Sequence, residues 1–336
     1  MITAQAPLGS GFTAASTAAD VLDGVDLRAS TAVVTGGASG LGIETARALA
    51  GAGASVIVPA RNVVAAGARL AGIDRVQVEY LDFLDATSID AFAERFLARH
   101  GSLQILVNGA GVMGLPLARD DRGYEVHFAT NHLGHFQLTA RLWPALVRAE
   151  GARVVSVSSS GHRYSPVHFD DLHYYQRGYE PMAAYGQSKT GNILFAVALD
   201  DRGRGFGVRA FSLHPGNAYT PLARHFDTAQ LQAIGVLDAS GRPVIDPARN
   251  KKSVEQAAAT AVWCATSPLL NDAGGVYCED CDVAMAAAAE EPPADGQEGP
   301  RLTTAAFTGV MPYAIDPDIA ERLWAVSARL AGVSLG

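Results

Sequence analysis

Residues 31–42 read Thr-Ala-Val-Val-Thr-Gly-Gly-Ala-Ser-Gly-Leu-Gly, an apolar run that leads into a glycine-rich turn. The apolar run at 31–35 predicts a buried strand, and the periodic segment at 41–50 predicts a helix directly after the turn. Glycines at such a turn let the backbone bend sharply and approach a pyrophosphate, and the helix N-terminus offers unpaired N–H groups to the phosphates. The stretch therefore favours a dinucleotide-binding turn over its alternative, a flexible connection without a ligand. The residues expected to contact the cofactor here are Gly36, Ser39, Gly40, Leu41 and Gly42.

Strand-like and helix-like segments alternate along the rest of the chain. Apolar runs predict strands at residues 31–35, 55–59, 76–81, 103–107, 153–157 and 208–213, with a seventh at 275–278. Helical patterns occupy residues 41–50, 88–99, 124–147, 184–200 and 254–265. Such alternation requires crossover connections, so the predicted fold is α/β: a doubly wound (Rossmann) parallel sheet of about seven strands with helices on both faces.

We predict a single domain with a tail at each end. Residues 1–16 are small and polar and predict a loose arm, followed by a short helix from Thr17. Residues 286–300 lack periodicity and predict a surface loop, whereas 318–330 has one apolar face and predicts a helix. The expected divisions are an N-terminal arm at 1–25, a Rossmann-type catalytic domain at 26–285, and a C-terminal loop and helix at 286–336 that pack on the same domain.

The composition excludes several classes of protein. The chain of 336 residues carries a formal net charge of -8, which disfavours nucleic acid and anionic membranes as partners. No stretch approaches the roughly 20 apolar residues of a membrane span, and the N-terminus lacks the features of a signal peptide. Three cysteines give no disulfide framework, so we expect a cytoplasmic protein. Cys278 and Cys281 form a C-x-x-C pair, but nothing nearby completes a zinc site, so no metal is predicted.

The end of the second predicted strand bears on the choice of cofactor. An acidic residue at this point would bind the adenosine ribose, but the chain has Ala60 and then Arg61. A guanidinium can bind the 2′-phosphate of NADP, so the sequence favours NADP, with NAD as the alternative. An arginine that is merely solvated at a strand end would favour neither. At the end of the third strand, Asp82 is a candidate to accept a hydrogen bond from the adenine amino group or, alternatively, to cap a turn.

A tyrosine and a lysine lie four residues apart in the predicted helix at 184–200, which places both on one face. The ordinary tyrosine pKa of about 10 is too high for efficient proton exchange at neutral pH, and we expect the Lys189 ammonium to lower the pKa of Tyr185. Tyr185 is thus a candidate general acid/base. Ser159, in the serine cluster after the strand at 153–157, is a candidate to donate a hydrogen bond to a substrate carbonyl. The alternatives are an exposed helix pair and serines that only cap a turn.

Taken together and in order, these motifs resemble the short-chain dehydrogenases/reductases, in their compact branch, over roughly residues 26–281. The resemblance rests on residues 35–42, Asn108-Gly109-Ala110-Gly111, Asn131, Ser159, Tyr185–Lys189 and His214-Pro215-Gly216. Residues 128–136 and the long insert before Tyr185 resemble the retinol-dehydrogenase-like and WW-domain-oxidoreductase-like members. The family usually has asparagine where this chain has Gly109, so one side-chain contact is lost.

The resemblance implies a role for each of these residues. Tyr185 exchanges a proton with the substrate oxygen, and Ser159 stabilises that oxygen. Lys189 also binds the nicotinamide ribose, and Asn131 positions a water that relays protons to the lysine. Further cofactor contacts are expected from Tyr185 and Lys189 themselves and from Phe83, Asn108, Ala110, Gly111, Pro215, Gly216 and Thr220. The implied reaction transfers a hydride between NADP(H), or alternatively NAD(H), and a secondary alcohol/ketone or aldehyde.

The least regular segments, residues 162–183 and 217–249, are expected to form the substrate site with the C-terminal tail. The first is rich in aromatic residues, which suit a sizeable apolar or ring-containing substrate or, equally, ordinary loop packing: Tyr164, Phe169, Tyr174, Tyr175 and Tyr179. Three histidines resemble metal ligands but are expected to be packed or hydrogen-bonded: His127, His132 and His135.

The expected partner is a small-molecule substrate, with a homo-oligomer through the long helices at 124–147 and 184–200 as a further possibility. Two other functions compete with catalysis on this fold. One is a non-catalytic NAD(P)-sensing binding protein, because fold does not determine function. The other is a sugar-nucleotide epimerase or dehydratase, which the glycine spacing disfavours. The complete set of polar residues favours an enzyme over a sensor: Asn131, Ser159, Tyr185 and Lys189.

Overall fold

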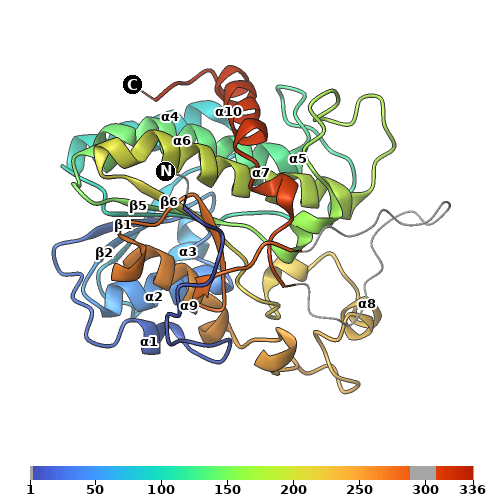
Figure 1. Cartoon of the computed structure of the whole chain (residues 1–336), viewed down its shortest axis with the longest axis horizontal. Coiled ribbons are helices and arrows are strands. Elements are labelled where there is room, and N and C mark those ends of the chain that lie inside the picture. The colour runs from blue at the N-terminus through green and yellow to red at the C-terminus, as the bar shows by residue number, and fades with distance from the viewer. Residues whose placement is uncertain (1–2, 288–307, 336) are drawn as a thin grey trace.

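The computed structural model describes residues 3–287 and 308–335, and it confirms the doubly wound α/β fold (Figure 1). Within these residues, eight strands form one sheet in the order β3-β2-β1-β4-β5-β6-β7-β8. The strands are β1 (Thr31–Val34), β2 (Ser55–Ala60), β3 (Val76–Tyr80), β4 (Ile105–Asn108), β5 (Arg153–Val157), β6 (Arg209–Leu213), β7 (Val276–Glu279) and β8 (Asp282–Val283). Neighbours from β3 to β7 are all parallel, and the strand order reverses between β1 and β4, where such sheets bind ligands.

The seven parallel strands match the predicted number, and β8 is an addition to it. β8 contains two residues and pairs antiparallel to β7. It follows a tight turn in which Asp280 and Cys281 have φ angles of 53° and 60°. A two-residue strand has no periodicity that a sequence pattern could reveal.

Helices cover both faces of the sheet (Figure 1). One face carries α1 (Ala18–Val21), α2 (Leu41–Gly51) and α9 (Val254–Thr266). The other carries α4 (Ala86–Arg99), α6 (Gly134–Val147) and α7 (Pro181–Gly203). The remaining α-helices of the described residues are α3 (Val63–Arg69), α5 (Val126–Phe128), α8 (Thr228–Ala233) and α10 (Pro317–Ala331). α3 and α8 were not predicted, because segments of seven and six residues are too short to show a helical period.

Strand β1 shows why the sequence of each central strand is a continuous apolar run. Ala32 and Val34 pack in the apolar layer beneath α2 and α9, and Val33 packs in the layer on the opposite face. All three side chains are fully buried. A strand covered on both faces needs an apolar side chain at every position rather than at alternate ones.

The predicted helix at 124–147 differs from the structure in two respects. It begins at Val126, because the Glu125 carboxylate accepts hydrogen bonds from the amides of His127 and Phe128 and caps the first turn. It is also interrupted between α5 and α6 by a π-helical turn at Ala129–Leu133. Such wide turns are uncommon and often occur at functional sites.

The N-terminal segment differs from the loose arm predicted for residues 1–16. The Gln5 side chain donates to the carbonyl oxygens of Tyr277 and Ala284, and the amides of Leu8 and Gly9 donate to the Asp282 carboxylate. The described part of the arm is therefore bound to the β7–β8 edge of the sheet. The short helix expected from Thr17 is present, with the Thr17 side chain as its cap.

The C-terminal helix predicted at 318–330 is confirmed as α10, which packs on α6 and α7 (Figure 1). Trp324 contacts Phe136 of α6 and Phe195 of α7, with ring centres 4.8 and 5.9 Å apart. Ser327 hydrogen-bonds His132 at 2.7 Å. α10 therefore covers part of the two helices that were expected to pair with a second copy. Most of the loop predicted at 286–300 lies outside the described residues.

Candidate active site

Tyr185 and Lys189 lie on consecutive turns of α7, as their four-residue spacing predicted. α7 begins at Pro181, and the Glu180 carboxylate caps its first turn. Both side chains are buried, and the Lys189 Nζ lies 5.6 Å from the centre of the Tyr185 ring. The same Nζ donates a hydrogen bond to the Val157 carbonyl at 2.9 Å. The lysine therefore connects the end of β5 to the candidate acid/base.

Ser159, just beyond the end of β5, lies beside Tyr185: a Cβ on Gly161 would be 3.3 Å from the Ser159 Oγ and 2.8 Å from the Tyr185 ring. Its Oγ also accepts a hydrogen bond from the Gly161 amide at 3.0 Å. The neighbouring serines have other roles, because the Ser158 hydroxyl binds the Lys189 carbonyl and the Ser160 amide binds the His214 ring. Of the three serines, Ser159 is the one whose side chain lies beside the tyrosine.

The acid–base properties of this pair differ from the expectation that the lysine lowers the tyrosine pKa. Burial raises the pKa of Tyr185 to about 12, although the neighbouring Ser159 side chain opposes that change. Burial also lowers the pKa of Lys189 to about 8. Both effects arise because a low-dielectric environment disfavours whichever form of a group is charged. At neutral pH the tyrosine is therefore protonated and able to donate its proton.

Asn131 lies in the π-helical turn, and its side chain is fully engaged with the protein. Its Oδ1 accepts a hydrogen bond from the Val112 amide at 2.8 Å, and its Nδ2 donates to the Val112 carbonyl and to the Ser188 hydroxyl. Gly111 lies between it and the lysine, since a Cβ on Gly111 would be 3.0 Å from Asn131 Oδ1 and 3.7 Å from Lys189 Nζ. Asn131 therefore connects the turn after β4 to α7.

The glycine-rich turn between β1 and α2 has the geometry expected of a phosphate-binding turn. Gly36 and Gly40 have φ angles of 71° and 50°, in the region that favours glycine. A Cβ on Gly42 would overlap the carbonyl oxygen of Gly36, so the turn itself requires glycine there. Gly40 precedes α2 without any side-chain cap, so no side chain occupies the N-terminus of the helix that begins at Leu41, although the Gly42 amide donates to the Ser39 carbonyl. Ser39 completes the turn through backbone hydrogen bonds with Gly36 and Gly42.

The loop after β6 reaches across to both turns. A Cβ on Gly40 would be 3.0 Å from the Thr220 side chain, and a Cβ on Gly114 would be 3.0 Å from the Phe226 ring. Pro215 and Gly216 begin this loop, and Gly216 has a φ of 88° and lies against the Lys252 side chain. The loop after β6 thus lies against both the glycine-rich turn and the segment after β4.

The three residues expected to contact the adenosine part of the cofactor lie in different environments. Arg61 is exposed directly after β2, where it is free to meet a phosphate. Asp82 caps a turn, because its Oδ1 accepts a hydrogen bond from the Leu84 amide at 3.0 Å. The Phe83 ring is buried against His135, with ring centres 4.4 Å apart, so its side chain belongs to the core.

The turn after β4 is attached to β1 by Thr35. The Thr35 hydroxyl accepts hydrogen bonds from the amides of Gly109 and Ala110 at 2.8 and 2.9 Å. Asn108 is buried, and its Nδ2 donates to the Thr139 hydroxyl, while its Oδ1 has no hydrogen-bond partner in the structure. Gly109, where the family has asparagine, is thus fixed through its backbone.

A buried polar cluster behind the tyrosine was not predicted. The Glu125 carboxylate is fully buried and lies 2.7 Å from His127 Nδ1 and 3.1 Å from the Tyr179 hydroxyl. Burial opposes ionisation of Glu125, but the hydrogen bonds from His127 and two backbone amides keep its pKa below the ordinary value. His127 Nε2 and the Tyr179 hydroxyl bind the amide and the carbonyl of Leu115. The His127 ring also meets the Tyr185 ring edge to face at 6.3 Å. No short-range pattern connects Tyr179 to this pair.

All three histidines singled out in the sequence are hydrogen-bonded within the protein, as predicted. Their partners are Glu125 for His127, Ser327 for His132 and Thr35 for His135. In the described parts of the chain, no group of three or more histidine, cysteine, aspartate or glutamate side chains is placed to hold a metal ion. Nor is any described helix long and apolar enough to cross a membrane.

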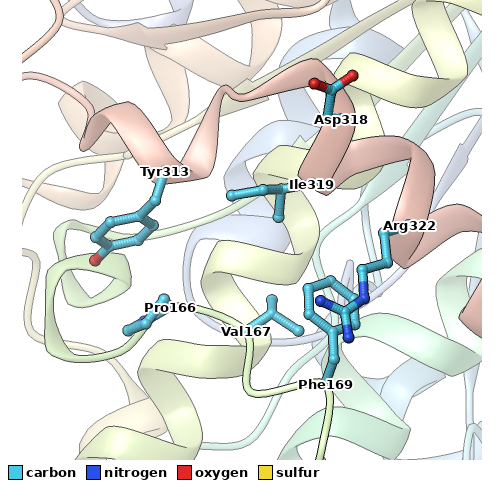
Figure 2. Close-up of a pocket in the computed structure, with 7 residues that line it drawn as sticks. All are labelled: Pro166, Val167, Phe169, Tyr313, Asp318, Ile319 and Arg322. Carbon is cyan, nitrogen blue, oxygen red and sulfur yellow. The ribbon is translucent and has the colours of Figure 1, made fainter.

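A cavity of about 430 Å³ lies between the insert and α10, and Tyr185 is not among the residues that line it (Figure 2). It is lined by Pro166, Val167, Phe169, Tyr313, Asp318, Ile319 and Arg322. The Arg322 guanidinium lies over the Phe169 ring, 4.1 Å from its centre. Of the aromatic residues in the insert, Tyr174 packs on Tyr179 and Tyr175 is exposed. Tyr174 therefore has a packing role.

The amino-acid sequence is similar to those of known oxidoreductases over most of its length. The profile of the short chain dehydrogenase family matches residues 30–231. A Streptomyces lividans protein named "Probable oxidoreductase" is 44% identical over 310 residues, which cover 90% of this chain and 98% of the relative. Human retinol dehydrogenase 12 is 36% identical over 318 residues, which cover 92% of this chain and 88% of the relative.

Solved structures resemble the fold over most of the chain. An uncharacterised protein from Mycobacterium paratuberculosis superposes with a TM-score of 0.70 at 30% identity, covering 96% of this chain and 99% of the other. RhlG of Pseudomonas aeruginosa, solved as an NADP active-site complex, has a TM-score of 0.59 at 25% identity and covers 75% of this chain and 94% of the other.

Proposed function

The chain belongs to the short-chain dehydrogenase family, in its retinol-dehydrogenase-like branch, and from that premise we propose that it transfers a hydride between NADP(H) and a carbonyl or alcohol group. The substrate would be a ketone or secondary alcohol, or an aldehyde, on a sizeable apolar or ring-containing molecule. The oxidoreductase names of its relatives and the arrangement around Tyr185 support this reaction.

One observation carries the proposal: Tyr185 lies beside both Ser159 and Lys189 in a buried site. In the reducing direction the bound cofactor supplies the hydride to the carbonyl carbon. Tyr185, protonated at neutral pH, gives its proton to the developing alkoxide oxygen, which yields the alcohol. Ser159 donates a hydrogen bond to the same oxygen as its charge develops. Lys189, with Asn131 behind it, binds the ribose and returns a proton to the tyrosine.

The residues present fit a nicotinamide dinucleotide. Gly36, Gly40 and Gly42 let the backbone of the turn after β1 approach a pyrophosphate, and the first amides of α2 have no side-chain cap. The exposed Arg61 and the lack of an acidic residue at the end of β2 favour NADP over NAD. The similarity to RhlG, which was solved with NADP, supports the same choice.

An apolar substrate is supported by residues of the segments after β4 and β6. The Phe226 ring lies beside Gly114, and the carbonyl of the neighbouring Leu115 accepts a hydrogen bond from Tyr179 of the insert. Aromatic and aliphatic walls with a few convergent polar groups are typical of sites for such ligands. The proposal includes a cytoplasmic location, which three buried cysteines, all free thiols, support.

The test is oxidation of NADPH and NADH by the purified protein against a panel of ring-containing ketones and aldehydes. We expect turnover that prefers NADPH, and a loss of about 100-fold in kcat in Ser159→Ala with NADPH affinity unchanged, because Ser159 acts on the substrate oxygen. Tight NADPH binding without turnover of any compound would contradict the proposal and favour the cofactor-sensing alternative.

A further inference from the structure

His135 lies in the first turn of α6, and no role in the reaction above requires it. Its ring is buried beside Thr35 and Asn131 and packs against the Phe83 ring. His135 Nε2 lies 2.8 Å from the Thr35 hydroxyl, and its Nδ1 lies 3.0 Å from the Asn131 carbonyl oxygen. One ring therefore contacts the end of β1 and the π-helical turn.

The partners determine which nitrogen carries the proton. The Asn131 carbonyl can only accept, so Nδ1 of His135 donates to it and Nε2 must be the acceptor. The Thr35 hydroxyl therefore donates its proton to Nε2. Burial lowers the pKa of His135 to about 3, in agreement with a ring that is neutral at physiological pH.

This arrangement satisfies the whole hydrogen-bonding capacity of the Thr35 hydroxyl. A hydroxyl has one proton to donate and two lone pairs that accept. The proton goes to His135, and the lone pairs accept the amides of Gly109 and Ala110. The other acceptor near the hydroxyl, the Val107 carbonyl, is farther away at 3.3 Å. His135 thereby fixes the orientation in which the hydroxyl can receive both amides.

The structures that depend on this hydroxyl border the cofactor site. Ala110 lies directly against the glycine-rich turn, since a Cβ on Gly36 would be 3.0 Å from the Ala110 N and Cα. Asn131, whose carbonyl binds His135, forms two hydrogen bonds with Val112, which belongs to the same turn after β4 as Ala110. The imidazole binds Thr35 and Asn131, and through these two residues it is connected to three segments: the glycine-rich turn, the turn after β4 and the π-helical turn.

We propose that His135 is a positioning residue for the cofactor: by binding the Thr35 hydroxyl and the Asn131 carbonyl, it fixes these three segments relative to one another. The inference rests on the proposed binding of NADP(H). It assigns His135 no contact with substrate or cofactor, so its effect is expected in cofactor affinity.

The test is calorimetric titration of full-length protein with NADPH, at a temperature well below the melting temperature of every variant. His135→Phe keeps a buried ring but removes both nitrogens. His135→Asn keeps a nitrogen near the position of Nδ1 but is too short to reach Thr35. His132→Phe is the matched control, because His132 is equally buried on the same helical stretch but binds Ser327 of α10 instead.

We expect NADPH to bind at least about tenfold more weakly to His135→Phe and about fivefold more weakly to His135→Asn. His132→Phe should bind within about twofold of the wild type although its melting temperature falls. Wild-type affinity in His135→Phe, or an equal loss in His132→Phe, would overturn the inference and leave the proposed function intact. If the wild type itself binds no NADPH, the proposed function is refuted and the inference fails with it.

Discussion

The Lys189 ammonium lies 5.6 Å from the centre of the Tyr185 ring, and both side chains are buried. An ammonium alone would lower the pKa of a neighbouring phenol, but burial dominates here and raises the pKa of Tyr185 to about 12. The same burial lowers the pKa of Lys189 to about 8. The site of the free protein therefore combines a protonated phenol with a lysine that titrates near the physiological range.

A pH dependence follows from the lysine. Lys189 is charged below a pKa of about 8 and loses its proton above it, while Tyr185, with a pKa of about 12, stays protonated throughout. We expect kcat/KM for NADPH, which reports groups of the free protein, to be level near pH 6–7 and to fall above about pH 8. In Lys189→Arg the charge persists, so any remaining activity should lack this fall. The same alkaline fall in both proteins would contradict the assignment.

The choice of cofactor is predicted to depend on Arg61. Arg61→Ala should raise KM for NADPH about tenfold or more and leave KM for NADH unchanged, because a charge-assisted hydrogen bond to the 2′-phosphate is lost. Arg47→Ala is the control, since Arg47 is an exposed arginine of α2 that pairs with Glu44. Equal changes for both cofactors in Arg61→Ala would show that Arg61 does not recognise the phosphate.

Two glycines at opposite ends of α2 are predicted to respond oppositely to alanine. A Cβ on Gly42 would overlap the Gly36 carbonyl, so Gly42→Ala should distort the turn and weaken NADPH binding more than tenfold. Gly51 has nothing within 4 Å of the position of its Cβ. Gly51→Ala should therefore keep normal binding and raise the free energy of unfolding by up to about 1 kcal/mol. Titration calorimetry and urea unfolding measure the two effects, and intact NADPH binding in Gly42→Ala would refute this account of the turn.

The stability of the fold is predicted to vary with the ionisation of Glu279. Burial raises its pKa to about 7 from an ordinary 4.5, although the Gly309 amide opposes this by donating to its Oε1 at 2.8 Å. Because the pKa of Glu279 is higher in the folded state than in the unfolded state, protonation of its carboxyl favours folding. This contribution to the free energy of unfolding is fully present below about pH 4.5 and is lost as the pH rises through 7. Glu279→Gln lacks this ionisation. The free energy of unfolding of the variant minus that of the wild type should therefore increase by roughly 1–3 kcal/mol from pH 4.5 to pH 8. Denaturant unfolding across this range checks the prediction, and a pH-independent difference would contradict it.

The features that depend on nearby residues were predictable from the sequence. The strand-turn-helix unit at residues 31–51 depends on an apolar run, three glycines and a helical period, all within one short segment. The pairing of Tyr185 with Lys189 depends only on helical geometry. These interactions are local, so a pattern in the sequence contains the information needed to predict them.

The features that depend on distant residues were not predictable. The hydrogen bond between Thr35 and His135 joins residues 100 positions apart in the sequence. The hydrogen bond between Tyr179 and Glu125 joins residues 54 positions apart. The π-helical turn around Asn131 does not show as a break in the apolar pattern of 124–147. The pKa of Tyr185 was misjudged because burial, a property of the whole fold, outweighs the neighbouring charge that the sequence displays.

The most direct test of the central claim compares NADPH-dependent carbonyl reduction by the wild type, Tyr185→Phe and Tyr175→Phe. Tyr175 is an exposed tyrosine whose hydroxyl binds the Gly123 carbonyl, so its loss controls for removing a phenol elsewhere. If Tyr185 donates the proton, Tyr185→Phe should bind NADPH within about twofold of the wild type but lose at least about 100-fold in kcat, while Tyr175→Phe should keep wild-type activity. Turnover by Tyr185→Phe at the wild-type rate would contradict the claim.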